Sequence, residues 1–335
     1  MEKIFVSFPE MKSVFLRILK ENGFSETRAA ICADIFATNS LEGVLSHGVN
    51  RFPRFIENIR KGYVIPGSEP TFIKSAGAIE QWDGNLGPGP LNALTATARA
   101  MDLAKQYGTG TVAMRNTNHW MRGGSYGWKA AGEGFAFIAW TNTEGNMPAW
   151  GASDCRLGNN PLVIAVPYGE HAIVLDFAMS LYSYGKMEMY SLEGRRLPFP
   201  GGFDSRGELT DDPAGILETR RTLPAGYWKG SGLSLMLDIL AAGLSGGLST
   251  GEISKGEAEY SLSQIFIAIS PEKICGKESF QDSINRIISD LKNSVPVNEG
   301  ASVRYPGESV LRTRQSFLSA GIPVNRAIWD KILSL

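Results

Sequence analysis

The sequence predicts an α/β protein in which a sheet region follows a helical amino-terminal segment, and three observations support this. Apolar residues repeat at helical spacing through residues 1–65. Between residues 87 and 270, helical patterns alternate with short apolar runs rich in β-branched residues. Helical spacing returns at the carboxyl end. Such alternation is typical of folds in which helices cover the faces of a sheet.

Start and stop signals define these elements in order. Ser7 begins a first helix and Gly23 ends it, and a second helix is expected over 25–40. A third helix should begin near His47 and end near Gly62. Further helices are expected at 87–108, 231–247, 279–293 and 325–334. Strands are expected at 109–115, 134–142, 160–167, 172–179 and 262–270.

Composition excludes several classes of protein. The 335 residues include 33 Lys and Arg against 34 Asp and Glu, without the basic stripe that a nucleic-acid binder usually shows. No apolar run approaches the roughly 18 residues of a membrane span, and no signal peptide is apparent. The three cysteines are far apart and no metal-ligand spacing is present, so we expect no metal site and a cytoplasmic location.

The sequence contains no Rossmann or Walker glycine loop. The stretch GNLGPG (84–89) has the wrong spacing, and KGSGLSL (229–235) offers two glycines without a preceding strand. A dinucleotide would therefore bind by another route.

The stretch SHGVNRFPRF (46–55) is the first candidate site. On the expected third helix, His47 and Arg51 would lie one turn apart on the same face. A histidine can give a proton to a developing alkoxide, and an arginine can hold a carboxylate with two parallel hydrogen bonds. The alternative is structural: Ser46 caps the helix, His47 is partly buried and Arg51 faces solvent.

Three other stretches contain candidate residues. RNTNHWMRGGSYGW (115–128) follows a predicted strand and contains His119, as a site histidine or as a satisfied interior one. Asp176 ends a buried-looking strand, where it could orient a histidine, bind a ribose hydroxyl or cap the strand end. Lys229 precedes an apolar helix, a favourable place for a phosphate, although helix starts are common.

The chain resembles the malate/L-lactate dehydrogenase family that lacks a Rossmann fold. The resemblance covers almost the whole chain and lies in SHGVNRFPRF, NTNHWMRGGSYGW, WTNTEGNMPAWG, LGNNPLVIAVP, DFAMS, GYWKGSGLSLMLD and YPGE. It implies the sulfolactate dehydrogenase-like α/β fold, in which helical segments from both chain ends flank a central mixed-sheet region that binds cofactor. Residues 1–70 and 295–335 would form the helical part, and 71–294 the central part.

The resemblance also implies an activity and site residues. It implies a homodimeric oxidoreductase that reduces a sugar acid with NADH or NADPH, and the lack of a basic cluster for a 2′-phosphate favours NADH. His47 would donate the proton, with His119 as the other candidate, and the catalytic group would include Arg51 and Asp176. Ser46, Arg51 and Asn118 would bind substrate. Cofactor contacts are expected from Ala172, Ile173, Val174, Leu175, Asp176, Phe177, Ala178, Trp228, Lys229, Gly307, Glu308 and Ser309.

Other functions are compatible with the same residues. A dehydrogenase of malate, lactate, sulfolactate or ureidoglycolate would keep the chemistry and change the substrate. A non-catalytic sugar-acid binding protein would bind the ligand without oxidising NADH. A cofactor-free lyase or isomerase would turn over substrate with no nicotinamide present.

Overall fold

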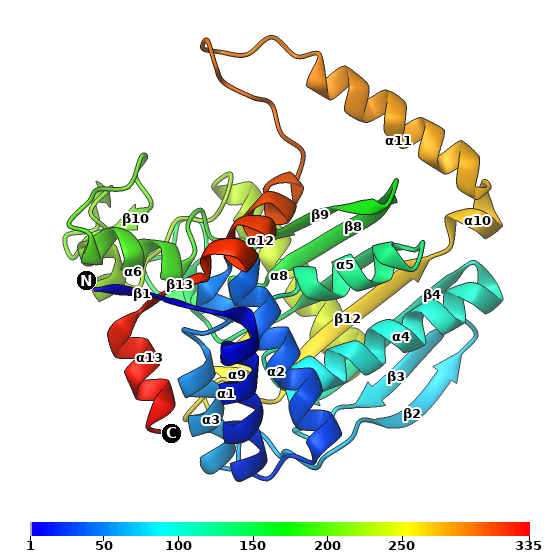
Figure 1. The fold of residues 1–335 in the computed structure, drawn as a ribbon, viewed down its shortest axis with the longest axis horizontal. Coiled ribbons are helices and arrows are strands. Elements are labelled where there is room, and N and C mark those ends of the chain that lie inside the picture. Colours follow the sequence, from blue (N-terminus) through cyan, green and yellow to red (C-terminus); the bar gives the residue numbers. More distant parts are fainter. Residues whose placement is uncertain (1) are drawn as a thin grey trace.

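A seven-stranded mixed sheet forms the centre of the molecule in the computed structural model, which describes residues 2–335 (Figure 1). Its strand order is β2-β3-β4-β12-β5-β8-β9, and only the β3–β4 pair is parallel. The strands are β2 (Thr71–Ala76), β3 (Ile79–Asp83), β4 (Thr109–Thr117), β5 (Ala136–Thr141), β8 (Leu162–Tyr168), β9 (His171–Phe177) and β12 (Leu262–Ile269).

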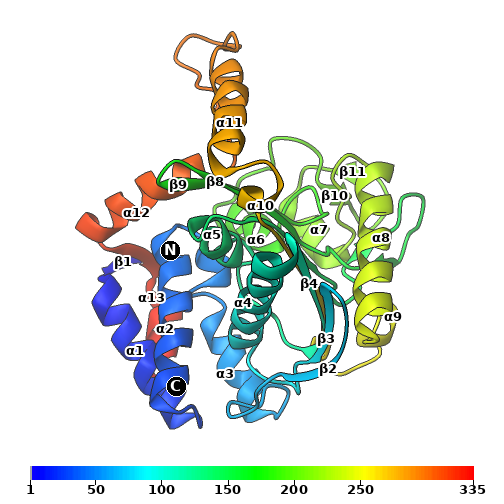
Figure 2. The same cartoon turned by 90° about the vertical axis from the view of Figure 1, so that its right-hand side faces the viewer.

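Helices cover both faces of this sheet. On one face lie α4 (Gly89–Tyr107) and α5 (Gly124–Gly132), and on the other lies α8 (Trp228–Ser245), as Figure 2 shows. The central strand β12 serves both layers because successive side chains point to opposite faces. Phe266 packs with the α4 and α5 residues, whereas Ile265 packs with Leu237 of α8.

The two chain ends form a separate helical layer with its own core. It contains α1 (Phe8–Glu21), α2 (Glu26–Leu41), α3 (Phe52–Arg60) and α13 (Arg326–Leu333). Here β1 (Lys3–Val6) pairs antiparallel with β13 (Ile322–Asn325). Aromatic rings hold the layer together: Phe15 stacks on Phe52 at 4.1 Å, and Phe36 meets Phe52 edge-on at 5.1 Å. Residues from opposite ends of the chain thus share one core.

Short elements complete the molecule. A small lobe contains α6 (Tyr184–Leu192), α7 (Pro213–Thr219), β10 (Gly202–Phe203) and β11 (Leu209–Thr210). The other elements are a 3-10 turn η1 (Leu45–His47), β6 (Met147–Pro148), β7 (Cys155–Leu157), α9 (Thr250–Ile253), α10 (Pro271–Ile274), α11 (Lys277–Lys292) and α12 (Glu308–Ala320). In residues 2–335 we find no helix both long and apolar enough to cross a membrane.

The structure corrects one element at the first candidate site. The expected helix from His47 does not form there: η1 ends at His47, and α3 begins at Phe52 with Arg51 as its cap residue. His47 and Arg51 therefore do not share a helical face. Gly48 explains the break, because a Cβ there would lie 2.2 Å from Ser40 Oγ, so the chain runs against α2 before α3 starts.

Among the elements that were not predicted are the β2–β3 hairpin and helix α12. The β2–β3 hairpin has mostly exposed side chains and therefore lacks the apolar alternation of a half-buried strand. Helix α12 has no buried residue, so its sequence has no core-facing stripe to recognise.

Candidate active site

Two histidines from distant parts of the chain meet at the junction of the helical layer and the sheet. The rings of His47, in η1, and His119, after β4, lie 5.8 Å apart between centroids and are nearly parallel. Ser46 Oγ lies 2.9 Å from His47 Nδ1, so the hydroxyl and this ring nitrogen form a hydrogen bond. The Asn39 amide donates to the His47 carbonyl at 3.0 Å, which anchors η1 to α2.

The backbone sets the tautomer of His119. The Met121 amide N–H donates to His119 Nδ1 at 3.1 Å, so Nδ1 acts as acceptor and the neutral ring carries its proton on Nε2. The neighbouring Asn118 amide donates to the Tyr63, Leu86 and Gly87 carbonyls. The structure therefore gives the Asn118 amide nitrogen a role in fixing the loop that presents His119.

Arg51 reaches the same place from the start of α3. It lines a small cavity with Asn118, His119 and Met121. Its Nη2 donates to Glu259 Oε2 at 3.2 Å, and Glu259 is only 8% exposed. One edge of the guanidinium is thus held by a buried carboxylate, while the rest of the fork remains for an anion.

Burial and nearby positive charge lower the pKa of both histidines. The pKa of His47 falls to about 4, first through burial and then through the charges of Arg51 and Arg122. Burial is also the main reason that the pKa of His119 lies well below its ordinary value, followed by the charge of Arg51. Both rings are therefore neutral near pH 7.

A buried ion-pair cluster lies behind the histidines. Glu42, at the end of α2, pairs with Arg122 and with Arg314 of α12. Glu42 and Arg122 are almost fully buried, and removing one partner of such a pair leaves an uncompensated charge. The cluster therefore ties the loop after β4 and helix α12 to the helical layer.

Asp176 does not contact either histidine. Its Oδ2 accepts the Gly124 amide N–H at 2.8 Å, at the start of α5. Burial raises its pKa, although Arg122 and the Gly124 N–H oppose the shift. Within residues 2–335 it receives no hydrogen bond from His47 or His119, so orientation of a histidine by Asp176 has no support in the geometry.

The expected cofactor residues fall in three places around β9. This strand is the edge of the main sheet, and edge strands present unpaired backbone groups. The Val174 N–H points outward and donates to Pro306 O at 3.2 Å, which brings Gly307–Ser309 at the start of α12 beside Ala172–Ala178. By the two-residue repeat, the backbone of Asp176 points outward as well.

The start of α8 approaches the carboxyl end of β9. The Ala225 N–H donates to Met179 O at 2.7 Å, so the turn leading to Trp228 and Lys229 lies beside the carboxyl end of the strand. Trp228 is 65% exposed and begins α8. A helix amino terminus favours a phosphate, although the Lys229 N–H already donates to Gly226 O at 3.2 Å.

These surroundings fit a dinucleotide. The indole Nε1 of Trp128 is buried and finds no acceptor among the described residues, although it lies next to β9 and Gly307. Gly307 has φ +86°, and a Cβ there would come within 3.3 Å of Trp128 and the Val174 backbone. An orphaned donor and an edge strand supply polar groups that a nucleotide needs, and Gly307 allows the turn before α12 to approach β9 closely. No group of three or more His, Cys, Asp or Glu in residues 2–335 could hold a metal ion.

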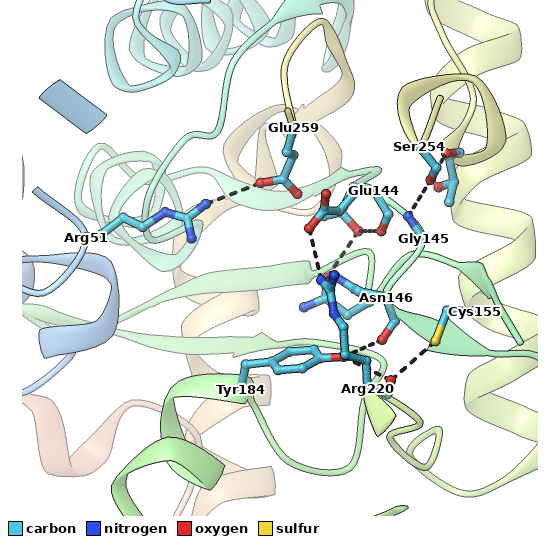
Figure 3. A network of polar contacts seen from close by, with 12 residues as sticks. Arg51, Glu144, Gly145, Asn146, Cys155, Tyr184, Arg220, Ser254 and Glu259 are labelled. Carbon is cyan, nitrogen blue, oxygen red and sulfur yellow. Dashed lines mark hydrogen bonds and ion pairs between the residues drawn. The ribbon is translucent and has the colours of Figure 1, made fainter. Parts of the chain in front are cut away.

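Four further polar residues lie near Arg51 and were not singled out from the sequence. Glu259 holds Arg51, and Figure 3 shows Glu144, Tyr184 and Arg220 close by. They come from loops and helix ends without any shared motif, so no spacing in the sequence could have grouped them. Only Glu144 carried a recognisable signal, because it follows the end of a predicted strand and loops at strand ends often contain site residues.

Comparison with known proteins gives this arrangement a family. The sequence profile described as "Malate/L-lactate dehydrogenase" matches residues 6–333. A 2,3-diketo-L-gulonate reductase of Klebsiella pneumoniae (strain 342) is 46% identical over 331 residues, which cover 98% of this chain and 99% of that protein. A protein of the same name from Pasteurella multocida (strain Pm70) is 45% identical over the same share of each chain.

Solved structures show the same fold. Malate dehydrogenase from Entamoeba histolytica has a TM-score of 0.93 at 27% identity and covers 99% of this chain and 98% of its own. Sulfolactate dehydrogenase from Methanocaldococcus jannaschii has a TM-score of 0.88 at 30% identity, with the same coverage. The mixed-sheet fold expected from the sequence is therefore confirmed, and a nicotinamide cofactor is implied. The chain belongs to the malate/L-lactate dehydrogenase family and is an oxidoreductase.

Proposed function

We propose that the protein reduces 2,3-diketo-L-gulonate to 3-dehydro-L-gulonate with a nicotinamide cofactor. The observation that carries the proposal is that His47 stacks on His119 at the layer junction, where His119 and Arg51 line one small cavity. A ketone-bearing carboxylic acid needs an anion clamp and a proton donor, and these side chains supply both. The names of the relatives that are 44–46% identical support this particular substrate.

The chain's own residues bind, orient and protonate. Arg51 holds the substrate carboxylate with the part of its guanidinium that Glu259 leaves open. His47 delivers the proton to the carbonyl oxygen, and Ser46 orients its ring through Nδ1. The negative charge of the bound acid raises the pKa of His47 from its low value in the free protein, which makes the proton available when it is needed. The cofactor, when bound, supplies the hydride.

Cofactor contacts come from the residues around β9. Ala172–Ala178 offer the outward backbone groups of the edge strand. Gly307–Ser309 lie beside Val174 in the middle of this strand, and Trp228–Lys229 lie near its carboxyl end. Lys229 and the first turn of α8 accept phosphate charge. We propose NADH as the cofactor, because no basic cluster for a 2′-phosphate stands out in the sequence.

We also propose that the protein is a cytoplasmic homodimer that buries one side of α8. Helix α8 packs on the sheet through Leu237, yet it also exposes a second set of apolar side chains: Leu233, Leu235, Met236, Ile239, Leu240 and Leu244 are each 37–52% exposed. A helix that is apolar on nearly all sides belongs in an interior. A second copy of the chain is the simplest cover for this face.

A substrate panel tests the proposed activity. Oxidation of NADH and of NADPH is followed at about 340 nm with 2,3-diketo-L-gulonate, oxaloacetate and pyruvate in parallel. We expect the highest kcat/KM with NADH and the diketo acid. Preference for oxaloacetate or pyruvate would reassign the substrate within the family. Binding of the diketo acid without oxidation of either cofactor would overturn the reductase itself.

A further inference from the structure

Glu144 lies on a rigid loop beside the proposed substrate site. It follows β5 by three residues, and its neighbours are fixed to three other segments. The Thr143 N–H donates to Asn160 Oδ1 at 3.1 Å, and the Gly145 N–H donates to Ser254 Oγ at 2.7 Å. The Asn146 N–H donates to Leu157 O at 3.0 Å. The backbone thus has little freedom to move the Glu144 side chain away.

Arg220 holds one side of the Glu144 carboxylate. Its Nη2 lies 3.3 Å from Glu144 Oε1. The Tyr184 hydroxyl donates its proton to Asn146 O at 2.7 Å and, more weakly, to the Arg220 carbonyl at 3.1 Å. Burial raises the pKa of Tyr184 to about 12, so the hydroxyl stays protonated and keeps this lock in place. Arg220 itself caps α7 with φ +57°, and its N–H donates to Ile216 O.

The other side of the carboxylate is free. Among residues 2–335, no group donates a hydrogen bond to Glu144 Oε2, and the side chain is 30% exposed. Figure 3 shows Glu144 and Glu259 between the guanidinium groups of Arg51 and Arg220. Burial lowers the pKa of Arg51, and the charges of Glu259 and Glu144 oppose this shift, so Glu144 is near enough to act on Arg51. Past the clamp on the substrate carboxylate, a ligand therefore next meets a negative charge.

We propose that Glu144 selects the substrate class. It accepts a hydrogen bond from a hydroxyl of a polyhydroxy monocarboxylic acid, and it repels the second carboxylate of a dicarboxylic 2-oxo acid. This rests on the proposed function, in which Arg51 binds the first carboxylate. A hydroxyl that donates to an ionised carboxylate makes a strong, charge-assisted hydrogen bond. A second carboxylate at the same place would face a like charge, and such repulsion is a common basis of discrimination between partners.

The Arg220 pair gives the proposal two variants with opposite expectations. Glu144→Gln removes the negative charge and leaves Arg220 as an unpaired cation, which would attract a second carboxylate. Arg220→Met leaves the charge of Glu144 uncompensated, which would strengthen the repulsion. A residue that only supports the fold would alter both kinds of substrate alike.

The experiment compares kcat/KM for 2,3-diketo-L-gulonate with kcat/KM for oxaloacetate in the full-length protein. For Glu144→Gln we expect the ratio to move toward oxaloacetate by about tenfold or more, since the loss of one charged hydrogen bond exceeds the 1.4 kcal/mol that a factor of ten requires. Arg220→Met should move the ratio the other way. Glu193→Gln is the matched control, because Glu193 forms a surface pair with Arg195 at 2.9 Å.

Each result is decisive. Equal losses for both substrates, or an unchanged ratio in both variants, would overturn the role of Glu144. If oxaloacetate turnover is too slow to measure, the inhibition constant of malonate replaces it, and it should fall in Glu144→Gln. If Glu144→Gln does not fold, as judged by its unfolding midpoint, the shift in Arg220→Met decides alone. Failure of the wild-type protein to reduce the diketo acid would instead count against the proposed function.

Discussion

At the scale of single residues, the proton donor is the main question, and the two histidines differ in their surroundings. His119 Nδ1 is occupied by a backbone N–H and its pKa lies well below the ordinary value. His47 has a rotatable hydroxyl at Nδ1 and a pKa of about 4. When a bound anion raises the pKa of His47, this ring can take up a second proton and act as the acid. We therefore favour His47 as the proton donor.

Substitution of each histidine checks this assignment. We expect His47→Ala to lower kcat about 10²- to 10⁴-fold, the usual contribution of a positioned acid, with a smaller effect on KM. His119→Ala should lower kcat less, because the neutral His119 of the unsubstituted protein contributes only a hydrogen bond from Nε2. His171→Ala, at the exposed β8–β9 turn, is the control. Near-normal turnover in both site variants would rule out the assignment.

The lowered pKa values also predict how stability depends on pH. The unfolded chain protonates His47 near its ordinary value of 6.5, whereas the folded protein does so near about 4. The unfolded state therefore binds more protons between these values, and stability falls as pH falls through this window. Urea unfolding at pH 7 and pH 5 measures the loss. It should be smaller in His47→Asn and unchanged in His171→Asn, and identical losses in all three proteins would contradict the burial of His47.

At the scale of elements, the start of α4 determines where His119 lies. Gly89 packs against the loop after β4 so closely that a Cβ would lie 2.2 Å from His119 O and 2.4 Å from Asn118 O. Backbone atoms cannot move aside as flexible side chains do. The helix and the histidine loop are therefore placed together.

Gly89→Ala should push α4 away from this loop. We expect a loss of about 1–3 kcal/mol in the free energy of unfolding, the usual cost of overpacking, together with a lower kcat/KM as His119 moves. Gly132→Ala is the matched control, because a Cβ at the end of α5 meets nothing within 4 Å. Its stability should stay the same or rise by up to about 1 kcal/mol. Full activity in Gly89→Ala would show that His119 does not depend on this contact.

At the scale of the whole molecule, the exposed side of α8 predicts the oligomeric state. Met236 and Ile239 are 50% and 52% exposed on a helix of a folded domain, and contiguous exposed apolar residues of this kind usually mark an interface. We expect the double variant Met236→Glu with Ile239→Glu to dissociate into monomers in sedimentation or light-scattering measurements. Leu192→Glu, a single exposed leucine on α6, should leave the assembly intact. A wild-type protein that is monomeric at micromolar concentration would refute the proposed dimer.

Much of the architecture was predictable from local patterns. Apolar runs and caps correctly placed the strands β4, β5, β8, β9 and β12 and the helices α1, α2, α4 and α8. Each has a strong apolar pattern, even where both faces are covered, as in β12. Elements with little burial, such as β2, β3 and α12, lack that signal. The predicted start of α3 was wrong, because a close contact between Gly48 and Ser40 interrupts the helical pattern of the sequence.

The amino-acid sequence by itself determined the fold class, the family and the identity of the chemistry-bearing residues His47, His119 and Arg51. Their side chains define the reaction, and their stretches are specific enough to be recognised. Tertiary structure alone decided that the two histidine rings lie 5.8 Å apart, that Glu259 restrains Arg51 and that Glu144 lies near Arg51. Arg51 and Glu259 alone are 208 positions apart in the chain, and no local periodicity records which segments pack together once the core excludes water.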